Sequence, residues 1–278
     1  MKLDKFMGIL MGTVSFSFAA AIISLITFLI AKGLDSISWE FLTKFPSNSM
    51  ESGGIFPAIL GSAYFLLIAL TFSIPIGILG AVFLSEYSSE NWLKKIILGS
   101  TNVLSSIPSI VFGLFGLALF SITFGFRTSL LSGGLTLGVL ALPYIISNTH
   151  EALKAVPDSY REASMALGAT KGETVFKVVI PASISRILTG VIISVGRIIG
   201  ETAPILFTGA AFYITSNPDS LLDPAMSLPT HIFVLSTVYP EAVTSNLEGT
   251  ISVMMIIVVA IFAVVNLKRL SERRKSGL

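Results

Sequence analysis

Long stretches without a single charged residue dominate this chain. The four longest are 9–30, 55–84, 96–126 and 128–149. An α-helix rises about 1.5 Å per residue, so about 20 apolar residues cross a hydrocarbon core about 30 Å thick. Apolar residues make up 53% of the sequence and charged residues only 12%, whereas soluble domains carry about 25% charged residues. The chain is therefore expected to be an integral membrane protein.

Two further stretches complete the set of expected spans. Residues 249–267 are apolar, and residues 178–207 are apolar except for Arg186, Arg197 and Glu201. The first apolar run is longer than the core of a signal peptide, so it is interpreted as a retained span. The expected fold is a single all-α membrane domain over residues 1–278, with six spans at about 9–30, 55–84, 96–120, 130–149, 182–207 and 249–267.

The distribution of Lys and Arg predicts the orientation, because these residues are retained on the cytoplasmic side. With the N-terminus inside, thirteen of the eighteen Lys and Arg residues fall in cytoplasmic segments. Only Lys32, Lys44 and Arg127 fall outside, while Arg186 and Arg197 lie within the fifth span. Both termini are therefore predicted to be cytoplasmic.

Two segments between the spans are long enough to fold. Residues 208–248 face outward, carry only acidic charges, and include the apolar run 232–238, which is too short to span and predicts a re-entrant or interfacial turn. Residues 150–181 face the cytoplasm and predict two short helices joined by Gly168. Pro157 suits a first helical position, Gly168 a left-handed cap, and Thr170 with Glu173 a capping box.

Composition excludes several classes of function. A net charge of +2 is too small for a nucleic-acid-binding chain. The absence of Cys and the presence of only two His exclude disulfides, thiol nucleophiles and multi-histidine metal sites. His150-Glu151 begins a zinc-protease pattern, but Lys154 stands where the second ligand belongs. No Gly-Lys dipeptide is present, so the chain lacks a Walker A loop, and any ATP must be hydrolysed on another chain.

The fifth span carries the residues least compatible with lipid. A charge at the bilayer centre costs about 3 kcal/mol, so such residues usually mark function. Arg197 and Glu201 are four apart and can pair on one face of the helix. Small and polar residues continue along this face, and we interpret them as the lining of a substrate pathway. The alternative interpretation is that Arg197 and Glu201 form an ion pair that only locks two helices together. The candidate pathway residues are Ser194, Arg197, Glu201, Thr202, Pro204 and Thr208.

The cytoplasmic loop contains a recognisable motif. Glu162-Ala163-Ser164, followed by Gly168 and, nine residues on, by Val178-Val179-Ile180-Pro181, resembles the EAA motif of ABC-importer permeases, with Ser164 a mild departure. In that family the first short helix couples the spans to an ATPase, so Arg161 and Glu162 would offer charges to that partner. An ordinary amphipathic helix is the alternative. The resemblance implies ATPase-coupling roles for Arg161, Glu162, Ala163, Ser164, Leu167, Gly168, Ala169 and Pro181.

A second motif narrows the resemblance to one branch of this family. Arg197 followed by Gly200-Glu201-Thr202-Ala203-Pro204 is similar to the signature of PstA-type permeases of phosphate importers, and residues 53–59, 107–116 and 151–157 agree with it. The sister permease, PstC, usually has Met-Ala where this chain has Ala203-Pro204. His150 and Gly172 depart from the PstA pattern, and both lie in the cytoplasmic loop.

The resemblance implies a MetI-like type I importer fold in a prokaryotic cytoplasmic membrane. It also implies four kinds of partner: a PstC-like second permease, two PstB-like ATPase subunits that hold ATP and Mg, a PstS-like extracytoplasmic binding protein, and membrane lipid. No cofactor and no catalytic residue are expected on this chain. Three alternatives stay open at this stage: the same machine importing sulfate, molybdate or tungstate; a proton-coupled secondary transporter using Glu201; and a membrane-embedded hydrolase, which would lack a base beside its nucleophile.

Overall fold

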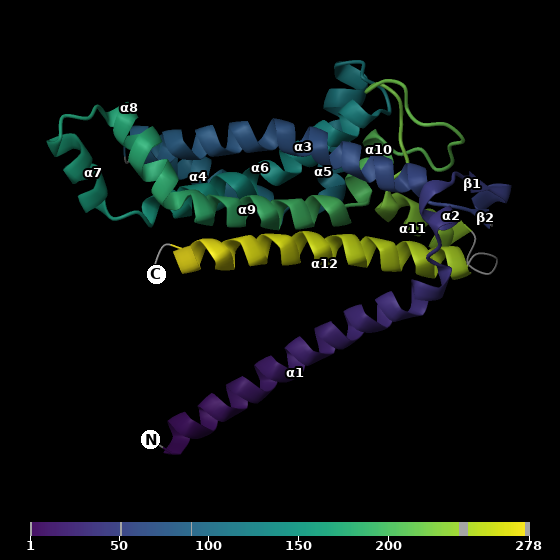
Figure 1. The fold of residues 1–278 in the computed structure, drawn as a ribbon. Helices are drawn as coiled ribbons and strands as arrows, with labels where there is room; N and C mark the ends of the chain where they lie inside the picture. The colour runs from purple at the N-terminus through teal and green to yellow at the C-terminus, as the bar shows by residue number, and fades with distance from the viewer. Residues whose placement is uncertain (1, 51, 90, 239–243, 276–278) are drawn as a thin grey trace.

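The computed structural model describes residues 2–50, 52–89, 91–238 and 244–275, and most of them are helical. Four helices run side by side along the length of the molecule: α3 (Phe56–Val82), α6 (Leu130–Lys154), α9 (Ile180–Gly200) and α12 (Thr244–Lys275) (Figure 1). Helix α1 (Lys2–Gly33) diverges from this bundle toward the N-terminus. The first residues of α1 and the last residues of α12 lie toward the end of the molecule that carries α7 (Asp158–Ala166) and α8 (Lys171–Thr174).

The expectation of a multi-spanning helical membrane protein is confirmed. Five helical segments of the described chain are long and apolar enough to cross a membrane, and a bent helix pair gives a sixth crossing if it is counted as one span. The α-helix α3 continues into the π-helix η3 (Phe83–Tyr87), so the second segment reaches three residues beyond the predicted end at residue 84. Pro75 lies inside α3 without interrupting it.

The third expected span is not one straight helix. It consists of α4 (Trp92–Ser106) and of α5 (Ser109–Gly116) with the π-helix η4 (Leu117–Thr123), and the two parts are bent by 104°. Pro108 lacks an amide hydrogen and disfavours helical backbone at the residue before it. Ile107 is accordingly extended, with φ −71° and ψ 136°. The third span, predicted at about 96–120, is therefore a pair of helices broken at Ile107 and Pro108.

The loop over residues 150–181 also differs from its prediction. Its first helix, α7 (Asp158–Ala166), is separate, and Gly168 follows it with a φ of +88° as expected. The expected second short helix, α8 (Lys171–Thr174), runs on through the π-helix η5 (Val175–Val179) into α9. The fifth span therefore begins at Lys171 and not near residue 182. The capping box of Thr170 and Glu173 forms as predicted and starts this long segment.

The core of the bundle is the contact between α3 and α6. Small residues let these helices approach closely, because a Cβ atom added at Gly134 would lie 2.5 Å from Ile68, and one added at Gly77 would lie 2.5 Å from Ile145. Phe65, Leu137 and Ile145 are almost fully buried in this contact. Close packing of small residues is the usual basis of helix association in membranes.

Short elements gather at the end of the bundle opposite α7 and α8. A hairpin of β1 (Pro46–Ser47) and β2 (Ser52–Gly53) follows α2 (Trp39–Thr43), and α11 (Leu228–Val238) lies beside the start of α12 (Figure 1). Helix α11 contains the apolar run that predicted a re-entrant or interfacial segment, and at 11 residues it is too short to span. Glu241 and Pro240 of the acidic outer loop lie outside the described residues.

Helix α1 joins the rest of the chain near its outer end. Lys32 forms an ion pair with Glu248 of α12 at 2.6 Å, and the Ser252 hydroxyl donates to the carbonyls of Leu29 and Ile30 at 2.9 and 3.0 Å. A Cβ atom at Gly33 would meet the Glu248 carbonyl at 2.1 Å, so the two backbones touch there. None of the most apolar window of α1 is buried in the chain.

Candidate functional site

A helix break places the charged pair of the fifth span. Helix α9 ends at Gly200, Glu201 is extended with φ −77° and ψ 127°, and α10 (Ala203–Thr208) starts a new helix. Pro204 has no amide hydrogen for the carbonyl of Gly200, and the sequence predicts a kink or unwinding at this point for that reason. The break confirms the prediction, and the Glu201 amide donates to the carbonyl of Ile198 at 3.2 Å as α9 ends.

Arg197 lies one turn before the break and is the most open of these residues. Its Nε atom is 3.5 Å from Oε1 of Glu201, and its side chain is 32% exposed against 13% for Glu201. The guanidinium carbon lies 4.6 Å from the centre of the Tyr144 ring, in a cation–π contact. Within the described chain Nε is buried and makes no hydrogen bond. The buried Nε atom faces Glu201, and the exposed part of the guanidinium is the part that an additional oxygen acceptor can reach.

Tyr144 ties this arginine to the bent third span, a role that the sequence did not indicate. Its hydroxyl donates to the carbonyl of Ser105 at 2.6 Å, immediately before the Ile107–Pro108 break. The hydroxyls of Ser105 and Ser106, just before Pro108, both donate to the carbonyl of Asn102. The available signal was a tyrosine in the middle of an apolar span, since a buried phenol needs an acceptor.

The rest of the predicted stripe does not form an open surface. Ser194, Pro204 and Thr208 are buried, and the hydroxyls of Ser194 and Thr208 donate to carbonyls four residues back in their own helices. Thr202 is half-buried. A Cβ atom at Gly190 would lie 2.5 Å from Asn148 of α6, so the small residues of α9 serve helix packing. Of the predicted pathway residues, only Arg197, Glu201 and Thr202 are partly exposed in the structure.

The loop over residues 150–181 presents an apolar, open surface at the end of the bundle that carries α7 and α8. Leu167 is 90% exposed, although it is a large aliphatic residue. A cavity of about 560 Å³ lies beside α7 and is lined mainly by small and apolar residues. Four of the predicted coupling residues line it: Ala163, Ser164, Leu167 and Ala169. Glu162, Gly168 and Pro181 are exposed nearby in the chain.

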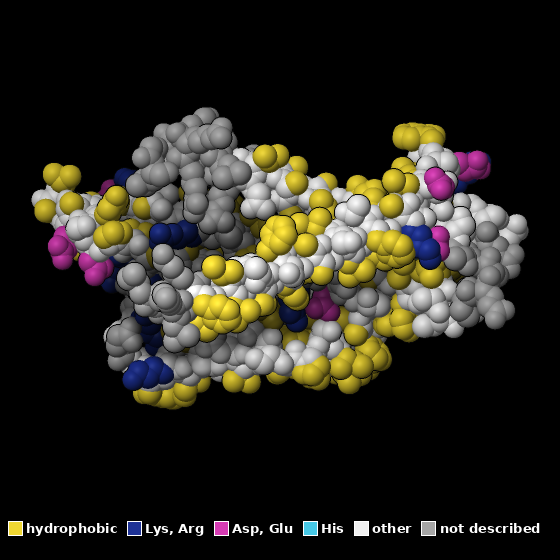
Figure 2. Space-filling model, turned by 90° about the horizontal axis from the view of Figure 1, so that it is seen from below, with side chains coloured by type: hydrophobic (Ala, Val, Ile, Leu, Met, Phe, Trp, Pro, Cys, Tyr) yellow, Lys and Arg dark blue, Asp and Glu magenta, His cyan; other side chains and the backbone are white. Residues whose placement is uncertain are grey.

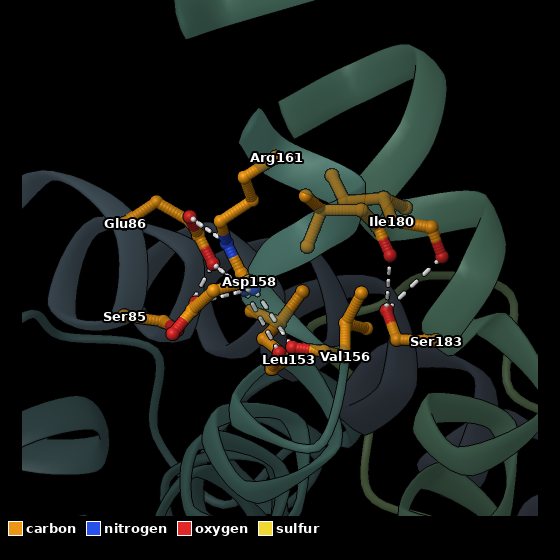
Figure 3. A network of polar contacts seen from close by, with 9 residues as sticks. Ser85, Glu86, Leu153, Val156, Asp158, Arg161, Ile180 and Ser183 are labelled. Atoms are coloured by element: carbon orange, nitrogen blue, oxygen red, sulfur yellow. Dashed lines mark hydrogen bonds and ion pairs between the residues drawn. The ribbon is translucent and has the colours of Figure 1, made fainter. Parts of the chain in front are cut away.

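Arg161 anchors α7 to the end of the second span (Figure 3). Its Nη2 and Nε atoms donate to the two carboxylate oxygens of Glu86 at 2.7 and 3.1 Å. The carbonyls of Leu153 and Val156 and the carboxylate of Asp158 accept the remaining hydrogen bonds, at 3.0, 2.8 and 3.3 Å. A guanidinium has five N–H donors, so all of them are used within the chain. The expectation that Arg161 offers its charge to a partner is therefore corrected.

The contact between Glu86 and Arg161 was not predicted from the sequence, because Glu86 lies at the end of an apolar stretch and belongs to no motif of the loop. Its side chain is only 7% exposed and that of Arg161 17%. The hydrogen bonds from Arg161 to Glu86 raise the pKa of Arg161 above its usual value, against the lowering effect of burial. The arginine is therefore always charged. The available signal was a single carboxylate directly after a 30-residue span without charges.

Comparison with known proteins places the chain among transport permeases. Residues 73–277 match the family described as binding-protein-dependent transport system inner membrane component. A probable ABC transporter permease protein, YqgI of Bacillus subtilis, is 34% identical over 93% of this chain and 92% of the relative. A phosphate transport system permease protein, PstA of Xylella fastidiosa, is 37% identical over 72% of this chain and 69% of its own length.

Solved structures agree on the fold. A chain of the MetNI methionine ABC transporter in an inward-facing conformation superposes with a TM-score of 0.62 at 19% identity, covering 78% of this chain and 96% of the other. A chain of a bacterial ABC transporter that imports the acidic polysaccharide alginate gives a TM-score of 0.59 at 15% identity over 94% and 93% of the two chains. Both superpositions show that this chain has the fold of an ABC importer permease.

Proposed function

Since the chain belongs to the family of binding-protein-dependent transport system inner membrane components, which are multi-pass permeases of ABC transporters, we propose a substrate for it. We propose that it carries inorganic phosphate across the membrane. It works in an assembly with a second permease, an ATPase and a binding protein. In the proposal these are a PstC-like permease, two PstB-like ATPase subunits that bind ATP and Mg, and a PstS-like binding protein on the outer side. This chain itself performs no chemical reaction.

The observation that carries the proposal is the state of Arg197. It is a guanidinium within a span, partly exposed, and its Nε atom makes no hydrogen bond within the described residues. Arginine matches phosphate oxygens with its planar fork of donors. Glu201 lies close enough to balance the charge while no anion is present. The similarity to PstA proteins supports phosphate over sulfate, molybdate or tungstate.

Coupling to ATP hydrolysis is proposed to pass through α7. The cavity beside it and the exposed Leu167 offer an apolar surface of the kind that a partner protein covers. Arg161 fixes α7 to the end of the second span through Glu86, and Ser164 is joined to Thr174 of α8 by a hydroxyl contact of 2.9 Å. Movement of α7 by an ATPase would therefore be passed directly to the second and fifth spans.

Uptake into vesicles that contain all four kinds of subunit tests the proposed substrate. We expect ATP-dependent phosphate uptake that arsenate competes for and sulfate does not, because arsenate shares the charge and tetrahedral geometry of phosphate. Sulfate competing as well as arsenate would overturn the phosphate assignment. Uptake that continues in vesicles without the ATPase would instead favour the proton-coupled alternative.

The turn after α7 provides a second test of coupling. Gly168 has a φ of +88° with open space around its Cα, so Gly168→Ala strains the backbone without any clash. An L-residue in this conformation costs about 1–2 kcal/mol. We expect fewer phosphate ions transported per ATP hydrolysed, with normal membrane insertion. Gly172→Ala is the matched control, because that glycine is helical and its added Cβ would lie 3.8 Å from the Tyr87 hydroxyl. Equal coupling ratios in the two variants would contradict this role for the turn.

A further inference from the structure

A second cavity, of about 520 Å³, lies on the other side of α7 from the apolar one, where the ends of three spans meet the loop. Its walls come from η3, α4, α6, α7 and α8. Nothing in the transport mechanism above uses this cavity. Most of the residues that line it are charged: Glu86, Lys94, Lys154, Asp158, Arg161 and Lys171.

The lining carries a net positive charge. Four cationic side chains stand against two carboxylates, which leaves +2. Both carboxylates already contact Arg161, Glu86 at 2.7 Å and Asp158 at 3.3 Å. Lys171 lies over the ring of Tyr87 at 5.2 Å, which holds its ammonium group at the rim of the cavity. The cavity therefore suits an anion with several oxygen acceptors.

One lysine of the lining is part of the packed structure. Lys94 is only 4% exposed and lies in the first turn of α4, whose N-cap Asn91 accepts from the Lys94 amide at 3.0 Å. Its neighbour Lys95 is exposed and does not line the cavity. The buried Lys94 forms a fixed inner wall of the cavity, and the exposed Lys154 and Lys171 stand at its entrance.

The cavity lies at the depth of the lipid headgroups. The second span ends at Tyr87, α4 begins at Trp92, and α6 ends at Lys154. Trp92 is 72% exposed, and exposed Trp and Tyr residues mark the membrane–water interface. Figure 2 shows that basic side chains gather toward the end of the molecule that carries α7 and α8, while hydrophobic side chains cover the middle of this face.

An exposed apolar stripe leads from the bilayer to this cavity. Leu79, Phe83 and Tyr87 follow one another at four-residue spacing along α3 and η3 and are 58%, 57% and 46% exposed. Tyr87, at the end of the stripe, is the residue that contacts Lys171. A phospholipid could thus place an acyl chain along the stripe and its phosphate group in the cavity.

We propose that this cavity is a binding site for a phosphate group, held by the exposed Lys154 and Lys171 with Lys94 in its inner wall, and with an anionic phospholipid as the ligand that the apolar stripe favours. Basic pockets between spans on the cytoplasmic side bind anionic headgroups in this way. The bound lipid would connect the second span, α4 and α8 beneath the coupling helix. Free inorganic phosphate has the same chemistry and is the other possible source of the group.

The experiment compares two pairs of exposed lysines in the complete complex, purified with its partner subunits. The test variant is Lys154→Gln/Lys171→Gln, and the control is Lys95→Gln/Lys177→Gln, which removes the same charge outside the cavity. Native mass spectrometry counts bound phosphatidylglycerol, and equilibrium dialysis with radiolabelled orthophosphate measures the free anion. We expect lipid retention to fall about tenfold in the test variant and to stay at the wild-type level in the control.

The other possible results of these two measurements also support or overturn the proposed site. Unchanged lipid retention, combined with a loss of orthophosphate binding in the test variant alone, supports the site and assigns it to the free anion. Lysine-to-arginine changes at 154 and 171 should keep whichever ligand is bound, because the positive charges remain. Identical behaviour of the test and control variants in both measurements would overturn the proposal. Since neither measurement uses transport, their failure leaves the uptake test unaffected.

Discussion

Replacing Arg197 with Gln is expected to abolish phosphate uptake by the assembled complex, with a loss of at least about a hundredfold. The substitution keeps most of the side-chain volume but removes the positive charge within the span. An anion entering a water-poor pathway then finds no compensating charge, and in a low dielectric this compensation is large. Uptake should be measured beside assembly on a native gel, because a complex that fails to assemble would give the same zero.

Three companion variants separate a transport role from a structural one. Arg197→Lys should recover only part of the uptake, because it keeps the charge and loses the planar fork. Tyr144→Phe removes the hydroxyl bond to Ser105 and keeps the ring over Arg197, so we expect a smaller loss than for Arg197→Gln. If Arg197 and Glu201 only lock the helices, the double change to Gln should transport about as well as the wild type. Full transport by that double variant would end the assignment of Arg197 to the pathway.

Arg161→Met is expected to destabilise the chain by about 3–5 kcal/mol and to uncouple ATP hydrolysis from uptake. The change leaves the Glu86 carboxylate buried without its partner, which is the costly way to break such a pair. It also removes the hydrogen bonds to the carbonyls of Leu153 and Val156 that hold the start of α7. Thermal unfolding in detergent measures the loss of stability, and the number of phosphate ions transported per ATP hydrolysed measures the uncoupling.

The exposed ion pair between Lys177 and Glu173 provides the control for this prediction. Its N–O distance of 3.0 Å is similar, but the side chains are 73% and 46% exposed. Lys177→Met should therefore change stability little. The double variant Arg161→Met/Glu86→Leu should recover most of the lost stability, since no charge remains buried. Equal unfolding temperatures for Arg161→Met and Lys177→Met would show that the buried pair does not hold the loop.

The spans could be predicted because a segment of about 20 apolar residues is recognised from its own sequence, without knowledge of the segments that pack against it. The run at 130–149 needs no knowledge of its neighbours, and the helix observed there, Leu130–Lys154, extends it by only one turn. Local backbone rules were equally reliable: Pro204 located the break beside Glu201, and Gly168 has the left-handed conformation of a helix cap. These features depend on residues within one turn of each other.

Features that depend on distant residues were missed. Pro108 accounts for a local break in the helix, but its sequence context does not give the 104° angle of the bend or the contacts of α5 with α6 and α10. Arg161 and Glu86 are 75 residues apart, and no pattern within either segment predicts their contact. The small residues of α9 fitted a polar pathway and a packing surface equally well, and only the position of Asn148 shows that Gly190 belongs to the second.

The contact between α1 and α12 has a consequence for how the protein is made. Apart from its outer end, α1 buries little of itself in the chain, and the partners at that end, Glu248 and Ser252, lie more than 200 residues later. At about 5–20 residues per second, translation needs at least about ten seconds to reach them. During that interval the first helix enters the bilayer with its docking partner still unsynthesised. Ribosomes stalled before residue 244 should therefore leave α1 free to diffuse in the lipid, and crosslinks from Lys32 to later residues should form only after α12 has emerged.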